Sequence, residues 1–307
     1  MSKPAHFIGI DIGGTNIKAV AVSEMGELLA STQFPTHDSE FAEWAPKVKT
    51  LMSQWQIEIG ETAGIGVASP GIVSPGHRTV SWMKGRMEAV CGFEWTDYLQ
   101  TPFFVPVLND AKAALVAEAW IGAAIGTSNA FLLTLGTGVG GAAIVDGQLL
   151  HGALGRSGHL GHISLDPYGA SDIVGTPGSL EDWIGGATLA TRTKNRYADT
   201  EALVKASEKG DPDASRIWLA AVKGLAAGIV SLINVLDPEI VILGGGITAA
   251  GDSLFAPLAS AIEQIEWRPF GPGVAVVPAQ LDEHAGAIGA ARFAMTFAKE
   301  FSSNASL

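Results

Sequence analysis

Cysteine and positive charge are both scarce in this chain. Cys91 is the single cysteine among 307 residues, which excludes an intramolecular disulfide and a metal cluster held by several thiolates. Lysine and arginine number 19 against 31 acidic residues, and the net charge is −12. Because nucleic acids and anionic membranes bind basic surfaces, we expect no nucleic acid and no membrane as a partner.

Long uninterrupted apolar runs are also missing. The most apolar stretch, residues 218–236, contains Lys223 and Asn234 and stops at Asp237, so it predicts a buried helix and not a membrane span. The first apolar strand is expected from residue 7, which leaves no room for a signal peptide before it. We therefore expect a cytoplasmic protein.

Glycine and apolar residues, in contrast, are abundant. Glycine contributes 38 residues, apolar residues make up 47% of the chain and charged residues only 16%. A chain of this length and composition can build a large core and two lobes of ordinary domain size. Much of the glycine is concentrated in three short clusters at the ends of apolar segments.

The first cluster lies in residues 7–22, FIGIDIGGTNIKAVAV, which we interpret as two apolar strands joined by a tight turn. The carboxylate of Asp11 sits at the end of the first strand, where a buried unpaired charge would be costly. The turn glycines let the backbone approach a ligand and direct N–H groups at it, which suits a phosphate chain with its Mg²⁺. The turn consists of Gly13, Gly14, Thr15 and Asn16. An ordinary Gly-Gly hairpin is the alternative interpretation.

The same arrangement recurs in residues 131–145, FLLTLGTGVGGAAIV, where the turn is formed by Gly136, Thr137 and Gly138. A third cluster follows the apolar strand expected at residues 240–243, and a nucleotide base and ribose would lie there against bare backbone. This cluster is Gly244, Gly245 and Gly246. Two similar hairpins suggest a duplicated architecture with a nucleotide between its halves.

Strand-like and helix-like patterns alternate along the rest of the chain. Strands are expected at residues 27–35, 64–68, 105–108, 240–243 and 274–278, and helices at 39–57, 111–120, 212–236, 252–265 and 287–300. Residues 151–186 are expected to be structured but irregular. The order predicts an α/β protein with two related lobes and a cleft between them. Asn109 and Asp110 fall at a strand-to-helix junction, the usual place for site residues in such folds, although Asp110 is alternatively a simple N-cap.

Five motifs, in this order along the chain, resemble those of the ROK family, which holds sugar kinases and sugar-responsive repressors on the actin-like ATPase (ribonuclease H-like) fold. They are Asp11-Ile-Gly-Gly-Thr-Asn, Asn109-Asp110-Ala, Leu135-Gly-Thr-Gly-Val-Gly-Gly, Gly158-His-Leu-Gly-His162 and Asp237-Pro-Glu-Ile-Val-Ile-Leu-Gly-Gly-Gly. The resemblance covers nearly the whole chain. It implies ATP-dependent phosphorylation of a hexose hydroxyl, usually the one on C6.

The resemblance also implies roles for individual residues. Asp110 would be the general base, Asp11 would hold Mg²⁺ through water, and the glycine turns would bind the phosphates of ATP. The sugar would be bound by Gly71, Asn109, Asp110, His159, His162 and Glu181. Simpler interpretations stay open, because Glu181 could be a first-turn helix acid, the two histidines ordinary loop residues, and Lys18 a structural residue.

Many members of the family carry a zinc motif of three cysteines completed by the histidine at position 162. Here the cysteine positions fall on Asp172, Val174 and Ser179. Valine and serine do not replace thiolates, and His162 with Asp172 would not complete a tetrahedral site. We therefore predict no structural zinc.

The identity of the sugar stays open at the sequence level. The glutamate that usually contacts the C1 and C2 hydroxyls of glucose is His159 here, as in bacterial N-acetylmannosamine kinases, which share the following Asp166-Pro-x-Gly. The first-lobe motif of glucose-type kinases is absent from residues 89–93, and Lys84, Arg86 and Glu88 would either compensate or form a solvated loop face. We expect a glucokinase-like hexose kinase, with an N-acetylmannosamine kinase as the alternative.

Other functions and the domain arrangement complete the sequence-based expectations. A family repressor would carry an N-terminal DNA-binding domain, and a non-catalytic sugar sensor would not need both aspartates, so we favour neither. Polyphosphate is a less favoured phosphoryl donor than ATP. Residues 1–108, with the helix at 290–304, are expected to form a small lobe and residues 109–289 a large one. The resemblance also implies a homodimer.

Overall fold

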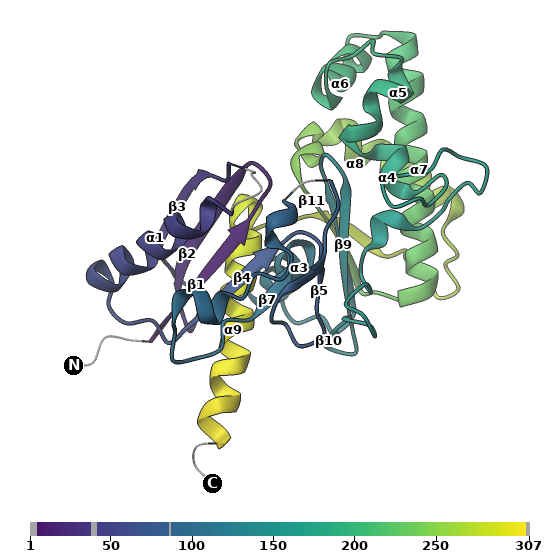
Figure 1. The fold of residues 1–307 in the computed structure, drawn as a ribbon. Coiled ribbons are helices and arrows are strands. Elements are labelled where there is room, and N and C mark those ends of the chain that lie inside the picture. The colour runs from purple at the N-terminus through teal and green to yellow at the C-terminus, as the bar shows by residue number, and fades with distance from the viewer. Residues whose placement is uncertain (1–4, 38–41, 86, 305–307) are drawn as a thin grey trace. The chain divides into compact units, whose positions relative to one another are not determined.

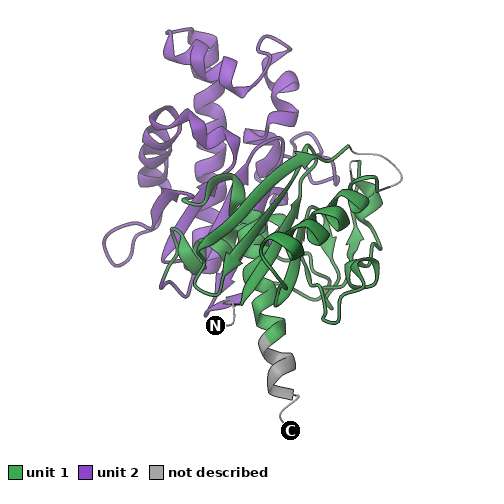
Figure 2. Cartoon of the chain, turned by 90° about the vertical axis from the view of Figure 1, so that its left-hand side faces the viewer, with its two compact units in different colours: residues 1–125, 151–157, 280–307 green, residues 126–150, 158–279 purple. Residues whose placement is uncertain are grey.

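The computed structural model describes residues 5–37, 42–85 and 87–304 (Figure 1). The chain divides into two compact units, green and purple in Figure 2. Unit 1 comprises residues 1–125, 151–157 and 280–307, and unit 2 comprises residues 126–150 and 158–279. The chain therefore passes from one unit to the other four times.

The sheet of unit 1 has five strands in the order β3-β2-β1-β4-β7. β1 pairs antiparallel with β2, and β2 with β3, whereas β1, β4 and β7 run parallel. The strands are β1 (His6–Ile12), β2 (Asn16–Ser23), β3 (Leu28–Pro35), β4 (Gly64–Ser69) and β7 (Val107–Asn109). β1, β2 and β4 are buried over most of their length because their side chains are apolar on both faces, whereas β3 alternates between exposed and half-buried residues, as an edge strand does.

The sheet of unit 2 repeats this topology in the order β10-β9-β8-β11-β12. Again the hairpin partners are antiparallel and the last three strands are parallel. The strands are β8 (Ala130–Leu135), β9 (Val139–Val145), β10 (Gln148–Leu149), β11 (Ile240–Gly244) and β12 (Ala275–Pro278). The prediction of a duplicated α/β architecture is confirmed.

Helix α9 (Ala285–Asn304), yellow in Figure 1, covers the sheet of unit 1 and packs along α3 (Asp110–Ile121). The helix comes unusually close to β1 and β4, because these strands carry glycine where they meet it. A Cβ atom on Gly9 would overlap the carbonyl oxygen of Ala287, and one on Gly66 would overlap that of Ala290. The smaller elements of unit 1 are α1 (Trp44–Glu58), β5 (Ile72–Val73), β6 (Val80–Trp82), η1 (Glu88–Val90), α2 (Trp95–Leu99) and η5 (Asp282–His284).

The packing of α3 on α9 accounts for a unit boundary that differs from the expected lobe boundary after residue 108. The expected boundary falls inside unit 1, which keeps Asn109, Asp110 and the whole of α3. Glu118, which is completely buried near the end of α3, fixes the place where the chain returns to unit 1. Its carboxylate accepts hydrogen bonds from the backbone N–H groups of Ala123 (2.7 Å), Gln280 and Leu281 (2.9 Å each). The closing helix α9 belongs to unit 1.

The helices of unit 2 surround α7 (Pro212–Leu236), which begins at the N-cap Asp211 and contributes Trp218, Leu225 and Ile229 to the core of the unit. The others are α4 (Leu180–Ile184), α5 (Leu189–Thr193), α6 (Thr200–Glu208) and α8 (Asp252–Ile265), with the 3₁₀ turns η2 (Leu160–His162), η3 (Gly186–Thr188) and η4 (Gly246–Ala250). By length and composition α7 could cross a membrane despite Lys223, contrary to our expectation, but 56% of its most apolar window is buried. Such burial is typical of a core helix.

Candidate active site

The turn after β1 is closed by local hydrogen bonds. The backbone N–H of Gly13 donates to the carbonyl oxygen of Asn16 over 3.1 Å. Thr36, which is completely buried, braces the turn from the end of β3: its hydroxyl donates to the carbonyl of Gly13 (2.5 Å) and its N–H to that of Thr15 (3.0 Å). Gly14 is half-buried and Thr15 is exposed. Sequence reasoning missed Thr36, because a threonine after a strand carries no signal of such a contact.

Asp11 lies near the end of β1 with its carboxylate against Gly286, in the first turn of α9. It is directly opposite Lys18 in the β1–β2 register, and the Lys18 ammonium also pairs with Glu283 at 3.3 Å. Burial and repulsion from Asp110 raise the pKa of Asp11 to about 7, and the positive charge of Lys18 partly opposes this. Lys18 thus contributes to the electrostatics of the site.

Asp110 occupies the first helical position of α3, and Asn109 is the N-cap. The side-chain oxygen of Asn109 accepts from the N–H groups of Ala111 (3.1 Å) and Lys112 (3.2 Å). Asp110 is therefore not the N-cap, which was the simpler interpretation of the sequence. Its Oδ1 accepts from the Ala111 N–H (2.8 Å) and from the Asn109 amide (2.9 Å). Burial raises the pKa of Asp110, although these hydrogen bonds lower it in part.

Asn109 also connects the start of α3 to Gly71. Its amide nitrogen donates to the Gly71 carbonyl over 3.2 Å, and Asn109 is only 5% exposed. Unit 1 therefore brings predicted site residues together near the ends of the neighbouring strands β1, β4 and β7. These are Asp11, the turn at residues 13–16, Gly71, Asn109 and Asp110. The two raised carboxyl pKa values fit a divalent cation, because a nearby positive charge would offset the mutual repulsion of the acids.

The corresponding turn of unit 2 lies between β8 and β9, where the Gly136 N–H donates to the Gly138 carbonyl (3.0 Å). Residues after α4 hold this turn from outside. The N–H of Gly186 donates to the carbonyl of Gly136 (2.9 Å) and that of Ala187 to the carbonyl of Thr137 (2.8 Å). The structure thus joins the turn to a segment about fifty residues away in sequence that the motifs did not mark.

Glu181 lies in the first turn of α4, and its carboxylate reaches beyond its own helix. Oε2 accepts from the Val139 N–H over 2.9 Å and lies against Gly138. The 3₁₀ turn η2 approaches the same strand, because a Cβ on Gly161 would overlap the Val139 carbonyl. Val139, the first residue of β9, therefore receives both Glu181 and η2, and a donor atom of His162 lies within 4.8 Å of the Glu181 carboxylate.

The third glycine cluster follows β11. Gly244 ends the strand opposite Thr134 of β8, and Gly245, with φ of +89°, lies against the backbone of Leu135. The hydroxyl of Thr248 donates to the Gly245 carbonyl over 2.7 Å, which closes the first turn of η4 at Gly246. The cluster and the turn at 136–138 thus follow neighbouring parallel strands of the same sheet.

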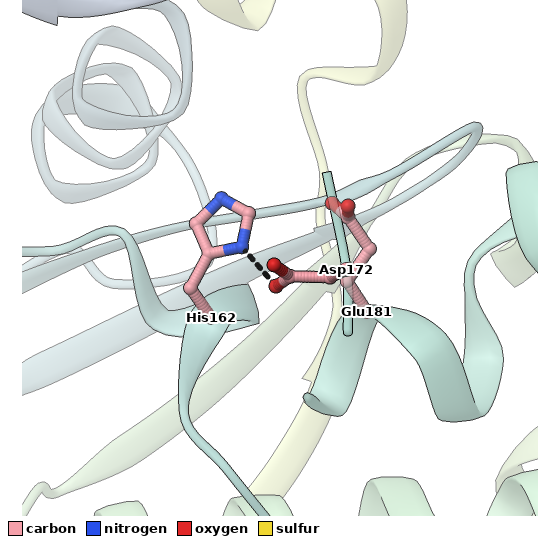
Figure 3. A group of neighbouring side chains, drawn as sticks. All are labelled: His162, Asp172 and Glu181. Atoms are coloured by element: carbon pink, nitrogen blue, oxygen red, sulfur yellow. Dashed lines mark hydrogen bonds and ion pairs between the residues drawn. The ribbon is translucent and has the colours of Figure 1, made fainter. Parts of the chain in front are cut away.

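His162 and Asp172 form a direct pair, with 2.8 Å between Nδ1 of the imidazole and Oδ2 of the carboxylate (Figure 3). The donor atoms of His162, Asp172 and Glu181 all lie within 4.8 Å of one another. The residues do not fit the family's zinc site, however. Val174 offers no ligand atom, and the hydroxyl of Ser179 caps α4 by accepting from the Asp182 N–H (3.3 Å).

Two further charged residues, which the sequence motifs did not mark, lie near the site. Arg192 of α5 donates to the Gly185 carbonyl over 2.7 Å, next to the hydrogen bond of Gly186 to the turn at 136–138. Lys112, only 3% exposed, donates to the Gly155 carbonyl over 2.9 Å, and burial lowers its pKa to about 8. Lys84 and Glu88 are exposed, and Arg86 lies outside the described residues.

Two sheets of one topology, each with a glycine turn after its first strand, define the actin-like ATPase fold. The chain belongs to the ROK family, whose model matches residues 7–296. A glucokinase of Thermotoga maritima is 32% identical over 92% of this chain and 95% of its own. An N-acetylmannosamine kinase of Yersinia pseudotuberculosis is 30% identical over 94% of this chain and 98% of its own. The resemblance that the motifs indicated is confirmed.

Solved structures agree with this assignment. The ROK hexokinase from Thermus thermophilus has a TM-score of 0.82 with 30% identity, covering 96% of this chain and 99% of its own. A ROK family glucokinase from Streptomyces griseus, in complex with glucose and AMPPNP, has a TM-score of 0.77 with 27% identity, covering 95% of this chain and 100% of its own.

Proposed function

We propose that this ROK-family chain phosphorylates a hexose with ATP, at the C6 hydroxyl. The observation that carries the proposal is the carboxylate pair of unit 1, in which Asp110 stands at the start of α3 and its charge repels that of Asp11. A base for the sugar hydroxyl and a carboxylate for a phosphate-bound cation are two groups that phosphoryl transfer requires. The relatives named glucokinase and the glucose and AMPPNP bound by the Streptomyces griseus enzyme support the same reaction.

Asp110 would act as the general base. Two donors, the Ala111 N–H and the Asn109 amide, hold Oδ1, so Oδ2 is the oxygen that can accept the proton of the hydroxyl. Burial raises the pKa of Asp110, which makes its ionised form a stronger base than an exposed aspartate. The rigid start of α3 would keep this oxygen in a fixed direction while the hydroxyl attacks the γ-phosphate.

Asp11 would hold Mg²⁺ through water, and the two glycine turns would bind the phosphates. Bound Mg²⁺ supplies positive charge that neutralises the phosphate oxygens. The turn at residues 13–16 directly follows β1, which carries Asp11, and the turn at 136–138 follows β8 in the sheet of unit 2. The cluster at residues 244–246 would contact the base and ribose, because bare backbone admits a flat ligand.

The sugar would be bound by residues of both sheets' loops. Asn109 and the Gly71 carbonyl, which are joined by a hydrogen bond of 3.2 Å, would bind it in unit 1. His159, His162 and Glu181 would do so in unit 2. Glu181, although a first-turn acid, supports this role because its carboxylate is held over β9 by the Val139 N–H.

An N-acetylmannosamine kinase is the second candidate. His159 replaces the glutamate that usually contacts the C1 and C2 hydroxyls of glucose, and a relative of that name is 30% identical. His159, which is half-buried at the N-cap of η2, would contact the C2 substituent of the sugar in this second candidate. We further propose a cytoplasmic homodimer that binds no nucleic acid.

Measuring ADP release with MgATP across a panel of sugars tests the proposal. The panel is glucose, mannose, N-acetylglucosamine, N-acetylmannosamine, fructose and allose, with polyphosphate replacing ATP in a parallel series. Selective turnover of glucose supports the glucokinase-like reaction, and selective turnover of N-acetylmannosamine supports the second candidate. No turnover on any sugar with either donor would contradict a hexose kinase.

A further inference from the structure

The loop between η2 and α4 is organised around the side chain of Asp172. Backbone hydrogen bonds first close the loop tip, where the Asp172 N–H donates to the Thr176 carbonyl (2.9 Å) and the Gly175 N–H to the Asp172 carbonyl (3.0 Å). The tip is tied to the base of the loop as well, since the Ser164 hydroxyl donates to the Pro177 carbonyl over 2.7 Å. The position of the Asp172 carboxylate is therefore fixed by its own backbone.

The carboxylate of Asp172 gathers donors from three parts of the loop. Oδ1 accepts from the N–H groups of Val174 (3.0 Å) and Thr176 (2.8 Å), and Oδ2 lies 2.8 Å from Nδ1 of His162. None of the side chain is exposed. Burial by itself raises the pKa of Asp172, but hydrogen bonds from His162, Thr176, Ser179 and Val174 outweigh it and leave the pKa below its ordinary value.

These contacts determine which nitrogen of His162 carries a proton. An ionised carboxylate can only accept hydrogen bonds, so Nδ1 of His162 must be the donor. The second ring nitrogen, Nε2, points away from Asp172 (Figure 3), and the side chain is 26% exposed. Neutral His162 consequently offers a lone pair on Nε2, which suits the acceptance of a hydrogen bond from a hydroxyl group.

We propose that Asp172 is a positioning residue. Its buried carboxylate holds His162, without a metal, so that Nε2 is directed at a sugar hydroxyl. The proposal rests on the proposed function in one respect, namely that His162 contacts the sugar. It extends that function by assigning Asp172, Val174 and Ser179 to a metal-free loop instead of a degenerate zinc site. A hydrogen-bonded partner of a functional histidine fixes both its tautomer and its orientation.

A cation bound by His162, Asp172 and Glu181 is the competing explanation, because their donor atoms lie within 4.8 Å of one another. Two contacts speak against it. The 2.8 Å separation of Nδ1 and Oδ2 is that of a charge-assisted hydrogen bond, and the Val139 N–H holds one oxygen of Glu181 against β9. A metal would have to displace the proton between His162 and Asp172.

The variant Asp172→Asn tests the proposal through kinetics. The amide oxygen can still accept from the N–H groups of Val174 and Thr176. The amide NH₂ cannot accept from Nδ1 of His162, so the imidazole of His162 loses its fixed tautomer. We expect the KM for the sugar to rise by about 10- to 100-fold, while the KM for ATP stays within about twofold of the wild-type value. Asp166→Asn is the matched control in the same loop, since its amide oxygen can still accept from the Tyr168 N–H (2.9 Å). Equal changes in both variants would overturn the positioning role.

Two measurements on the wild-type chain keep the proposal testable if Asp172→Asn does not fold. Nitrogen-15 NMR of the histidine rings, with His162 assigned by loss of its signals in His162→Gln, should show the Nδ1–H tautomer. Elemental analysis of the purified protein should find far less than one zinc or other transition metal per chain. An Nε2–H tautomer, or one metal per chain, would overturn the proposal.

The same experiments distinguish a failure of the sugar contact from a failure of the positioning role. If His162→Gln leaves the KM for the sugar unchanged, the sugar contact of the proposed function fails. The tautomer and the metal content still decide whether Asp172 positions His162. If sugar binding depends on His162 but the ring is metal-bound, the proposed function survives and the metal-free loop does not.

Discussion

At the residue scale, Asp110 is held in a way that separates binding from catalysis. One of its oxygens is fixed by Asn109 and Ala111, and the other is available to a hydroxyl. The variant Asp110→Asn keeps an oxygen for these two donors, so we expect a folded protein. Its kcat should fall by about 10²- to 10⁴-fold, the usual contribution of a general base, with the KM values for sugar and ATP little changed. Steady-state kinetics of ADP release checks this.

A suitable control for that variant is Asp97→Asn, which changes an exposed aspartate of α2 in the same unit. It should have wild-type kcat. If Asp110→Asn retained near-wild-type turnover, Asp110 would not be the base.

The electrostatics of Asp11 predict a pH-dependent affinity for Mg²⁺. Since its pKa is raised to about 7, Asp11 holds a proton below that pH, and this proton must leave before the carboxylate can serve a cation. We expect the apparent affinity for Mg²⁺ to rise roughly tenfold between about pH 6 and pH 8. Titration of Mg²⁺ into the ADP-release assay at several pH values measures it.

Lys18 provides a second test of the same electrostatics. Its positive charge lowers the pKa of Asp11, so Lys18→Met should shift the Mg²⁺ dependence to higher pH. Lys223→Met, on an exposed position of α7 in the other unit, is the control. An identical pH dependence in wild type and Lys18→Met would show that Lys18 is only structural.

At the scale of the elements, the close approach of α9 to the sheet of unit 1 depends on glycine. In Gly66→Ala the new Cβ would meet the backbone carbonyl of Ala290 and not a flexible side chain, so α9 must move. We expect a loss of about 1–3 kcal/mol in the free energy of unfolding, as for other overpacked interiors. Chemical denaturation measures it.

Gly76→Ala is the matched control, because nothing lies within 4 Å of a Cβ at this exposed glycine. Its stability should change by less than about 0.5 kcal/mol. Equal effects of the two alanines would mean that the contact between α9 and β4 is looser than the structure shows.

The elements also show what could be predicted from the sequence. The strands β1, β2, β8 and β9 were predictable because each is an apolar run bounded by a glycine turn. Helices α5 and α6 were not predicted, since they are short and α6 is largely polar. The boundary between the units differs from the expected lobe boundary for another reason: it depends on the contact between Ala113 and Gly289, which no local pattern encodes.

The residues of the candidate site were also predicted only in part. Motifs located Asp11, Asp110 and the glycine turns because backbone geometry and residue type coincide there. The His162–Asp172 pair and the reach of Glu181 to Val139 were not predicted. They depend on how an irregular loop folds, and residue spacing in that loop pointed only to a lost metal motif.

At the scale of the whole molecule, neither unit is a continuous piece of chain. Residues 1–125 lack α9, so they leave the glycine-lined face of β1 and β4 uncovered. We expect this fragment to show no cooperative thermal unfolding. Circular dichroism during heating checks the expectation.

The control joins residues 1–125 to residues 280–307 by a short flexible linker. The linker is feasible because Glu118 binds Ala123 and Gln280 at the same carboxylate. This protein should regain a cooperative transition. A cooperative transition in the fragment without α9 would contradict the role assigned to that helix.

The repeated topology of the two sheets has a consequence for how such a protein can diversify. Between its third and fourth strands the first copy carries α1 in the part that the structure describes, whereas the second copy carries residues 158–239, with α4 to α7 and the loop around Asp172. Under the proposed roles, this insertion holds His159, His162 and Glu181, while the base Asp110 belongs to the other copy. Mutation can therefore explore new sugars in the insertion of one copy, at little risk to the proton acceptor in the other. Under these roles, the duplication places the residues that would select the substrate and the residue that would accept the proton in separate copies.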